Sequence, residues 1–173
     1  MKNLMFIALL ASVMLACQPQ VEPAEKQYFT SSPEIDVTKK LMQAYLDADW
    51  DLYRSLHADT CIVMHNSYSK TMSPDSATAF HKSGRTNISN LSLTGPAAGS
   101  PVYEMIVSDD GAKWVHFWGL WKATYNPTGA EVSFPLNISF RMDGGKINLL
   151  AAIYNGAPLL AESMKAESMA GTE

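Results

Sequence analysis

Four histidines are the side chains of this sequence best suited to chemistry near neutral pH: His57, His65, His81 and His116. An imidazole can exchange a proton near pH 7, and it is also a common ligand of metal ions. No two of these histidines have the H-x-H or H-x-x-x-H spacing of a zinc site. The sequence also has no G-x-S-x-G, Walker or dinucleotide-binding motif. We therefore expect no metal site and no tightly bound cofactor.

The four histidines differ in the positions that the sequence predicts for them. His57 is expected at the end of a helix and His81 on the exposed side of another helix, where each would be solvated. His116 lies in an aromatic strand and could face either a pocket or a partner molecule. His65 ends a predicted strand, where both a structural and a catalytic role are open.

The two cysteines have different expected roles. After Lys2, residues 4–15 are almost wholly apolar, a run too short to span a membrane and typical of a signal peptide. The following Leu15-Ala16-Cys17 resembles the lipobox of bacterial lipoproteins, which implies that Cys17 becomes a lipid-modified N-terminus. Gln18 after that cysteine implies the outer membrane of the bacterial envelope. Cys61 lies in an apolar run, where a small core residue is expected rather than a nucleophile.

Composition excludes several classes of partner. The formal net charge is -4 and no block of Lys and Arg occurs, so a nucleic-acid surface is not expected. The same charge gives the protein surface no affinity for anionic lipids, so a membrane would be contacted only through the lipid on Cys17. The division expected is a signal peptide at 1–16, a flexible tether at 17–32, one domain at 33–156 and a tail at 157–173 that is either a frayed helix or disordered.

Local signals place helices in the first half of this domain. Ser32 and Ser73 are each followed by proline and an acidic residue, the pattern of a helix N-terminus. Helical spacing of apolar residues then predicts one helix from Pro33 and another from Pro74 that continues to Leu91. A short helix is expected from Asp49, with Leu52, Tyr53 and Leu56 facing inward. A strand over 60–65 follows it.

The second half reads as antiparallel strands over 103–108, 114–125, 132–140 and 147–154, separated by Gly-, Asp- and Asn-rich turns. Helices followed by an antiparallel sheet predict an α+β fold with three helices on a strongly curved sheet. The strand over 114–125 is the centre of this sheet, because it has large rings on both faces. One of these faces is expected to line a pocket.

Two segments resemble nuclear-transport-factor-like domains, a superfamily that includes ketosteroid isomerases and SnoaL-like polyketide cyclases. One runs from Asp49 to Thr60 and on to His65, and the other covers Phe134–Asn137 and the Asp143–Lys146 hairpin. The resemblance covers residues 33–154 and specifies the fold better than the activity. It implies a cone, with the bent sheet wrapped around a pocket that three helices close. It also implies pairing of two copies through their sheets.

The resemblance assigns roles to individual residues. The general-base aspartate of the isomerases falls on His65 and their protonated oxyanion-hole aspartate falls on Asn137. Their oxyanion-hole tyrosine falls on Leu41, and Tyr45 lies one helical turn later. A histidine base and an asparagine donor could support a cofactor-independent isomerase, dehydratase or cyclase. The loss of both carboxylates and of the tyrosine argues against the ketosteroid isomerase reaction itself.

The faces of the strands decide what the pocket contains. If Asn137 points into the pocket, the alternating apolar residues of 132–140 point outward, and a homodimer is favoured to cover them. The opposite register places those apolar residues in the core and Asn137 in water. Counting back from Pro135 assigns Phe117 and Trp121 to the pocket and Trp118 to the outer face. The turn at 126–130, one residue longer than in the relatives, could reverse this assignment.

Three functions are therefore held against one another. The first is a lipid-anchored domain that binds a small apolar or amphipathic molecule, in a pocket bordered by Tyr45, Phe117 or Trp118, Trp121 and Tyr154. The second is an enzyme that uses His65 as base and Asn137 as donor. The third is a structural or assembly module that acts through its sheet face.

Overall fold

The structure is a computed structural model that describes residues 27–171. The predicted signal peptide, Cys17 and most of the predicted tether lie outside these residues and stay predictions. Within the described part, no helix is long and apolar enough to span a membrane.

Three helices in the first half begin where the sequence predicts. Helix α2 spans Pro33–Asp47, α3 spans Trp50–Ser55 and α4 spans Pro74–Arg85. Each start is fixed by a polar cap, because the side chains of Ser32, Asp49 and Ser73 accept hydrogen bonds from backbone N–H groups in the first turns. Leu52 of α3 is exposed rather than facing inward as predicted, whereas Tyr53 is buried.

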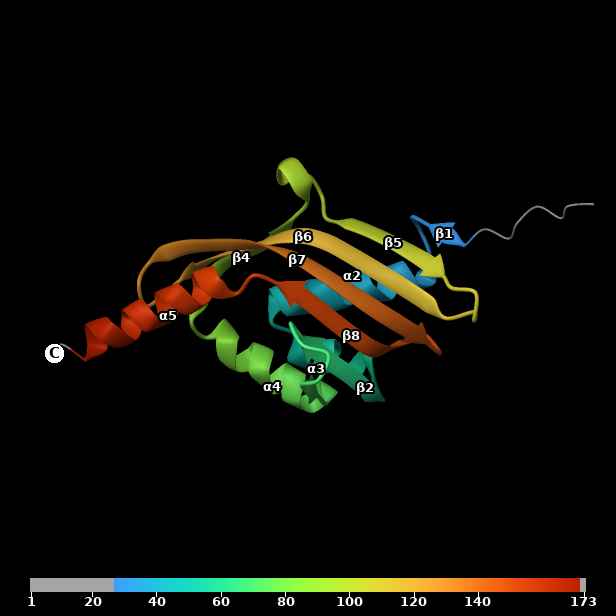
Figure 1. The fold of residues 1–173 in the computed structure, drawn as a ribbon, viewed down its shortest axis with the longest axis horizontal. Coiled ribbons are helices and arrows are strands. Elements are labelled where there is room, and N and C mark those ends of the chain that lie inside the picture. Colours follow the sequence, from blue (N-terminus) through green and yellow to red (C-terminus); the bar gives the residue numbers. More distant parts are fainter. Residues whose placement is uncertain (1–26, 172–173) are drawn as a thin grey trace, which may run out of the picture.

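Eight strands of the described residues form one sheet (Figure 1). Its central order is β5-β6-β7-β8-β2, all antiparallel except for β2 and β8, which are parallel. Strand β4 pairs with β6 beyond the end of β5. The strands are β1 (Tyr28–Phe29), β2 (His57–His65), β3 (Thr71–Met72), β4 (Ile88–Thr94), β5 (Val102–Val107), β6 (Lys113–Tyr125), β7 (Ala130–Asp143) and β8 (Lys146–Tyr154).

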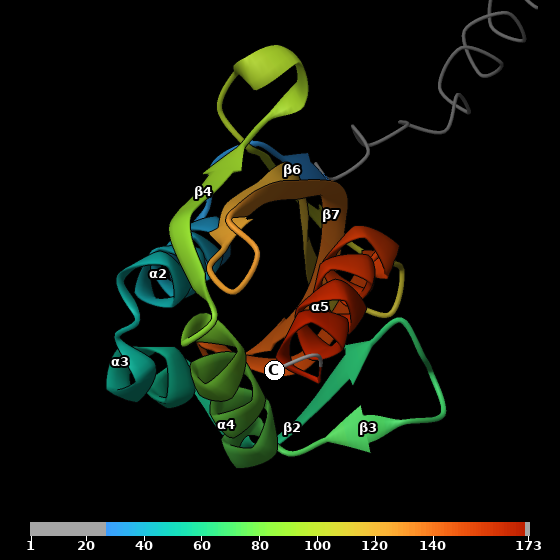
Figure 2. The same ribbon diagram turned by 90° about the vertical axis from the view of Figure 1, so that its left-hand side faces the viewer.

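The fold is the predicted α+β arrangement, in which the bent sheet and the helices surround an interior (Figure 2). The helices are not all N-terminal, however, because α5 (Ala157–Ala170) follows the sheet. A helix was one of the two states predicted for this tail. A short 3-10 turn, η1 (Pro96–Ala98), connects β4 to β5.

Two segments were predicted as the wrong kind of element. Helix α4 ends at Arg85, and Ile88–Thr94 forms strand β4 because this segment pairs with β6, from Ile88 opposite Tyr125 to Thr94 opposite Leu120. Residues 28–29, assigned to the tether, pair with β5 as strand β1. Both errors have one cause, since pairing with a distant strand outweighed the local pattern.

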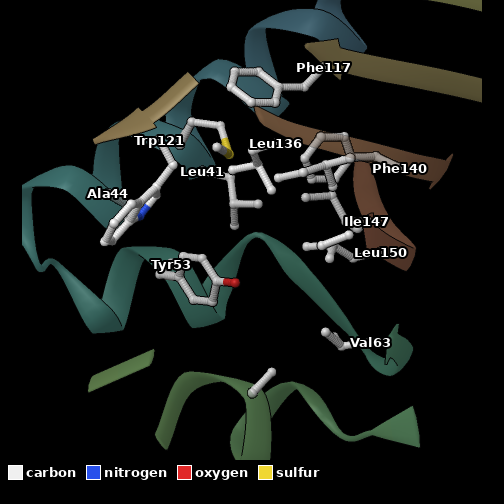
Figure 3. Packing of buried hydrophobic residues seen from close by; sticks show 14 of the residues in the cluster. Leu41, Ala44, Tyr53, Val63, Phe117, Trp121, Leu136, Phe140, Ile147 and Leu150 are labelled. Atoms are coloured by element: carbon white, nitrogen blue, oxygen red, sulfur yellow. The ribbon is translucent and has the colours of Figure 1, made fainter. Parts of the chain in front are cut away.

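The core lies between the concave face of the sheet and α2. Phe117 of β6 and Phe140 of β7 are fully buried there, next to Leu41 of α2 (Figure 3). Alternate residues of β7 from Val132 to Met142 are buried, while those between them are mostly exposed. The apolar face of β7 is therefore the inner face.

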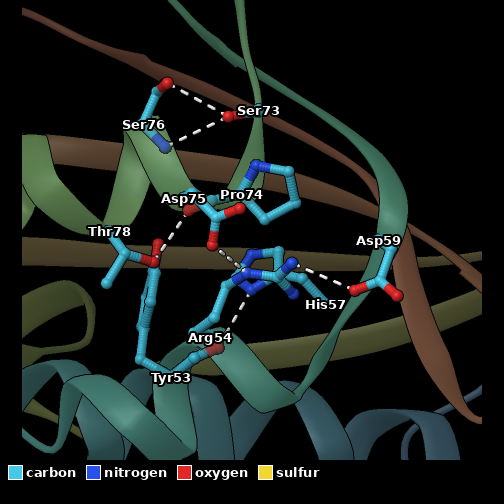
Figure 4. A network of polar contacts seen from close by, with 9 residues as sticks. All are labelled: Tyr53, Arg54, His57, Asp59, Ser73, Pro74, Asp75, Ser76 and Thr78. Atoms are coloured by element: carbon cyan, nitrogen blue, oxygen red, sulfur yellow. Dashed lines mark hydrogen bonds and ion pairs between the residues drawn. The ribbon is translucent and has the colours of Figure 1, made fainter.

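Arg54 of α3 links helix α4 and strand β2 through two ion pairs (Figure 4). Its Nε lies 2.6 Å from a carboxylate oxygen of Asp75 in α4, and its Nη2 lies 3.0 Å from one of Asp59 in β2. Beside it, the ring Nδ1 of His57 is 2.9 Å from the carbonyl oxygen of Tyr53. His57 is completely buried, so the prediction that it is solvated was wrong. These contacts fix α4 against β2.

Candidate functional site

A cavity of about 160 Å³ lies between the inner face of the sheet and helices α2 and α4, and it is partly open to solvent. An enclosed volume near 150 Å³ is sufficient for a ligand such as benzene. The lining is mostly apolar. It consists of Leu41, Met42, Tyr45, Tyr53, His65, Phe80, His81, Gly84, Arg85, Ile88, Trp121, Phe134, Leu136, Ile138, Leu150, Ala152, Tyr154 and Leu159.

Three stacked rings form the wall of the cavity on the sheet side. Trp121 and Phe134 lie on paired positions of β6 and β7, with ring centroids 4.7 Å apart and planes 7° from parallel. Tyr154 of β8 continues the stack at 5.3 Å from Phe134. The indole N–H of Trp121 donates to the hydroxyl of Tyr45 at 3.1 Å. This wall offers a flat apolar surface with a polar group at its end.

A cluster of histidine and tyrosine rings forms the opposite side. The ring of His81 in α4 has its centroid 5.1 Å from that of His65, 5.3 Å from that of Tyr45 and 5.6 Å from that of Tyr53. His65 also contacts Phe80 and Tyr154 at centroid distances of 5.5 and 6.0 Å. His81 thus lies at the centre of the cluster, so the prediction that it is solvated was wrong.

Burial sets the protonation state of this cluster. It lowers the pKa of His65, and it lowers the pKa of His81 to about 3, with the nearby His65 and His57 adding to the effect. Burial also raises the pKa of Tyr53 and Tyr154. At neutral pH the cavity therefore presents neutral imidazoles and neutral phenols.

Neutral imidazoles beside hydroxyl groups can bind polar groups of a ligand or accept a proton from it. The Nδ1 of His65 is buried and has no hydrogen-bond partner within residues 27–171. The hydroxyl of Tyr45 accepts from Trp121, so its own proton is available for donation. No group of three or more His, Cys, Asp or Glu that could hold a metal ion occurs among the described residues.

The structure brings together four of the predicted site residues: Tyr45, His65, Trp121 and Tyr154 all line the cavity. Phe117 faces inward as predicted, but its ring is fully buried against Tyr103 instead of bordering the cavity.

Two other predicted site residues lie on the opposite face of the sheet. Trp118 is 36% exposed on the outer face, to which the count from Pro135 had assigned it. Asn137 is exposed beside it, directly opposite Trp118 in the β6–β7 pairing. The pairing of His65 with Asn137 across one cavity was therefore wrong.

The turn between β6 and β7 explains the position of Asn137. Four residues, 126–129, separate Tyr125 from its partner Ala130, and the rest of the pairing follows from this start. Ile138 then lies opposite the inward-facing Phe117, so Asn137 must point outward. The inner and outer faces of β6 are therefore the predicted ones, whereas those of β7 are the reverse of the prediction.

The reversal also removes the reason given for a dimer. Phe134, Leu136, Ile138 and Phe140 are buried inside the chain itself and need no partner. The outer face still exposes apolar side chains, including Trp118, Val102 at 42% and Ile153 at 44%. The oligomeric state stays a prediction.

Tyr53, His81 and Arg85 are cavity residues that the sequence analysis did not assign to the site. A signal for two of them was present, because Ala77, His81, Arg85 and Ile88 are spaced by four, four and three residues. The inward face predicted for this helix contained Phe80 and Gly84, which lie next to His81 and Arg85 on the helix surface. All four residues border the cavity. Tyr53 was expected to face inward, but only as a core residue.

Comparison with known proteins identifies the fold. No family model matches the sequence, and no curated protein matches it. Among solved structures, 320 chains match. They include a protein with a ketosteroid isomerase-like fold from Catenulispora acidiphila, in complex with trimethylamine (13% identity, TM-score 0.57, covering 73% of this chain and 90% of that chain).

Two further structures agree with the first. One is described as a SnoaL-like polyketide cyclase from Shewanella putrefaciens (10% identity, TM-score 0.59, covering 78% of this chain and 98% of the other). The other is an NTF2-like protein from Burkholderia pseudomallei (17% identity, TM-score 0.60, covering 76% and 97%). The chain therefore has the cone fold of ketosteroid-isomerase-like, SnoaL-like and NTF2-like proteins, as the sequence predicted. At these identities the likeness establishes the fold alone.

Proposed function

We propose that this protein binds a small, largely apolar molecule in the cavity, with the ligand stacked on Trp121, Phe134 and Tyr154. The stacked aromatic wall carries this proposal, because all three of its rings border the cavity and together present one flat apolar surface to it. A concave, mostly apolar cavity with a few convergent polar groups is the usual form of a small-molecule site. The Catenulispora protein, which has this fold, is in complex with a small molecule, trimethylamine.

Gly84 in α4 gives a test in which folding is preserved. A Cβ added to Gly84 meets no atom within 4 Å, and the residue borders the cavity. We expect Gly84→Phe to weaken binding of the apolar fluorescent probe N-phenyl-1-naphthylamine by about tenfold, since a ring there takes space from the ligand. Binding is measured by the increase in probe fluorescence and by quenching of tryptophan emission.

Two control variants accompany this experiment. Gly84→Ala should keep probe binding and raise the free energy of unfolding by about 0.5 kcal/mol, because alanine favours the helix. Ser83→Phe places the same ring on an exposed position of α4 and should leave binding unchanged. Equal binding by the wild type and Gly84→Phe would show that the probe does not occupy the cavity, and the proposal would fall.

Cofactor-independent isomerase, dehydratase or cyclase chemistry is the second candidate function. The buried, unpaired Nδ1 of His65 favours it, with Tyr45 in place of Asn137 as the donor. The Shewanella protein described as a polyketide cyclase has the same fold. If the purified chain does not accelerate deuterium exchange at the acidic C–H of 2-tetralone, followed by proton NMR, this candidate loses its support.

We further propose that the protein is held in the bacterial envelope by a lipid on Cys17, most simply at the outer membrane. The apolar run before Leu15-Ala16-Cys17 supports this proposal. Expressed in a bacterium that processes lipoproteins, the wild-type chain should incorporate radiolabelled palmitate and sediment with membranes. Cys17→Ser should do neither, whereas Cys61→Ala should behave like the wild type. Label in the Cys17→Ser chain would refute the anchor.

A further inference from the structure

Arg85 is the only charged side chain among the described residues that line the cavity. The other polar groups there are tyrosines and histidines, which are neutral for the reasons given above. No aspartate or glutamate borders the space. The cavity therefore contains one positive charge and no negative charge from the described chain.

The guanidinium of Arg85 lacks a counter-ion within residues 27–171. Its Nη1 donates to the carbonyl oxygen of Ile88 at 2.8 Å, and its Nε is buried without a partner. No carboxylate is paired with it in the described part of the chain. Arg54 in the same molecule contrasts with this, because it is bound by both Asp59 and Asp75.

A half-buried cation beside an apolar wall has lost part of its hydration, and an anion that binds it replaces the lost interaction. A guanidinium forms its strongest hydrogen bonds with carboxylates, whose two oxygens match its planar donors. The structure thus combines an apolar surface for the body of a ligand with an uncompensated charge at its side.

The hydroxyl of Tyr45 supplies a second donor near this charge. Burial raises the pKa of Tyr45, while the bond from Trp121 and the positive charge of Arg85 partly oppose that increase. Because Trp121 donates to the Tyr45 oxygen at 3.1 Å, the phenolic proton is free to bind an acceptor on a ligand.

We infer that the ligand of this cavity carries a carboxylate, which binds Arg85 and the Tyr45 hydroxyl while its apolar body stacks on Trp121 and Phe134. The inference rests on the proposed function and adds the chemical class of the ligand to it. A purely structural role for Arg85 predicts something different. In that case the side chain only satisfies the carbonyl of Ile88 after the end of α4, and its loss changes stability without changing which ligands bind.

A matched pair of probes separates these roles. The compounds 1-naphthaleneacetate and 1-naphthaleneacetamide have the same apolar body and nearly the same shape, but only the first is charged at pH 7. Isothermal titration calorimetry with the purified full-length chain should show about tenfold tighter binding of the acid, the gain expected for a charge-assisted hydrogen bond. Arg85→Gln should weaken acid binding by about tenfold and leave amide binding unchanged.

Two more variants make the outcome decisive. Arg85→Lys keeps the charge and should retain a preference for the acid. This variant is the control that substitution at position 85 leaves a folded protein able to bind. Arg141→Gln removes an exposed arginine outside the cavity lining and should behave as the wild type does. Equal affinity of the wild type for the two probes, or equal weakening of both probes by Arg85→Gln, would overturn the inference while the proposed binding function stands. Failure of both probes to bind the wild type would remove the proposed function and this inference with it.

Discussion

Replacement of Phe140 by alanine is expected to lower the free energy of unfolding by about 4 kcal/mol. The ring of Phe140 is fully buried on the inner face of β7. In the sheet, Phe140 is paired with Val115 of β6 on one side and with Leu150 of β8 on the other. Its removal loses the burial of a large ring and leaves a void that rigid neighbouring strands cannot fill. Urea unfolding followed by tryptophan fluorescence measures the change.

The neighbouring residue supplies the control. Arg141 is exposed on the outer face of the same strand, and Arg141→Ala should change the free energy of unfolding by less than about 0.5 kcal/mol. Domains of this size are stable by only about 5–15 kcal/mol, so Phe140→Leu serves as a milder variant if the alanine form does not fold. A larger cost at Arg141 than at Phe140 would mean that β7 has the opposite register.

The sequence could not decide which face of β7 points inward. Strict alternation over 132–140 predicted a strand with one apolar and one polar face, and β7 has both. Alternation does not say which face points inward, because that depends on the residue at which pairing with β6 begins. The four-residue turn before Ala130 sets this point. The role that the resemblance assigned to Asn137 did not transfer to this chain, because Asn137 lies on the outer face of β7.

The helix starts could be predicted because their cause is local. Ser32 and Ser73 each bind a backbone N–H three residues ahead, and the proline after each suits the first helical position. The end of α4 has no such local cause. Helical spacing continued through Ile88 and Leu91, but Ile88 gains a strand partner in Tyr125, far along the chain.

The residues of the candidate site were also predictable only in part. Trp121, Tyr154 and Tyr45 were assigned to the pocket because aromatic strands and the resemblance placed them there. His81 and Arg85 were missed because they lie beside the apolar face of the helix, where polar side chains are ordinarily expected to face water. Only the packing of α4 across β2, fixed in part by Arg54, turns these polar residues toward the interior.

His81 should also make the stability of the fold sensitive to acid. Burial lowers its pKa to about 3 in the folded chain, from an ordinary value of 6.5. Because the folded pKa is lowered, the unfolded chain binds the extra proton between these two values. Stability is therefore fully present above pH 6.5 and is lost as the pH falls toward 3. His65 and His57, whose pKa values are also lowered by burial, act in the same direction.

The magnitude follows from the same linkage. Each histidine can contribute up to about 1.4 kcal/mol per pH unit below its unfolded pKa. His81 is half-buried, so we expect it to contribute about 2 kcal/mol of destabilisation between pH 7 and about pH 4.5. Urea unfolding of the wild type and of His81→Gln across this range measures that contribution, because the carboxylates titrate in both proteins and cancel in the difference.

The difference in stability between the two proteins should be constant above pH 7. Below pH 7 the wild type should lose stability relative to His81→Gln, since the glutamine amide does not bind a proton. Protonation of His81 would place a charge 5.1 Å from the ring of His65, among the phenol rings of Tyr45 and Tyr53. That environment offers no carboxylate among the described lining residues to compensate the charge. Curves that stay parallel down to pH ~4.5 would show that water reaches His81 freely, and the cavity would then not be the apolar site that the aromatic wall indicates.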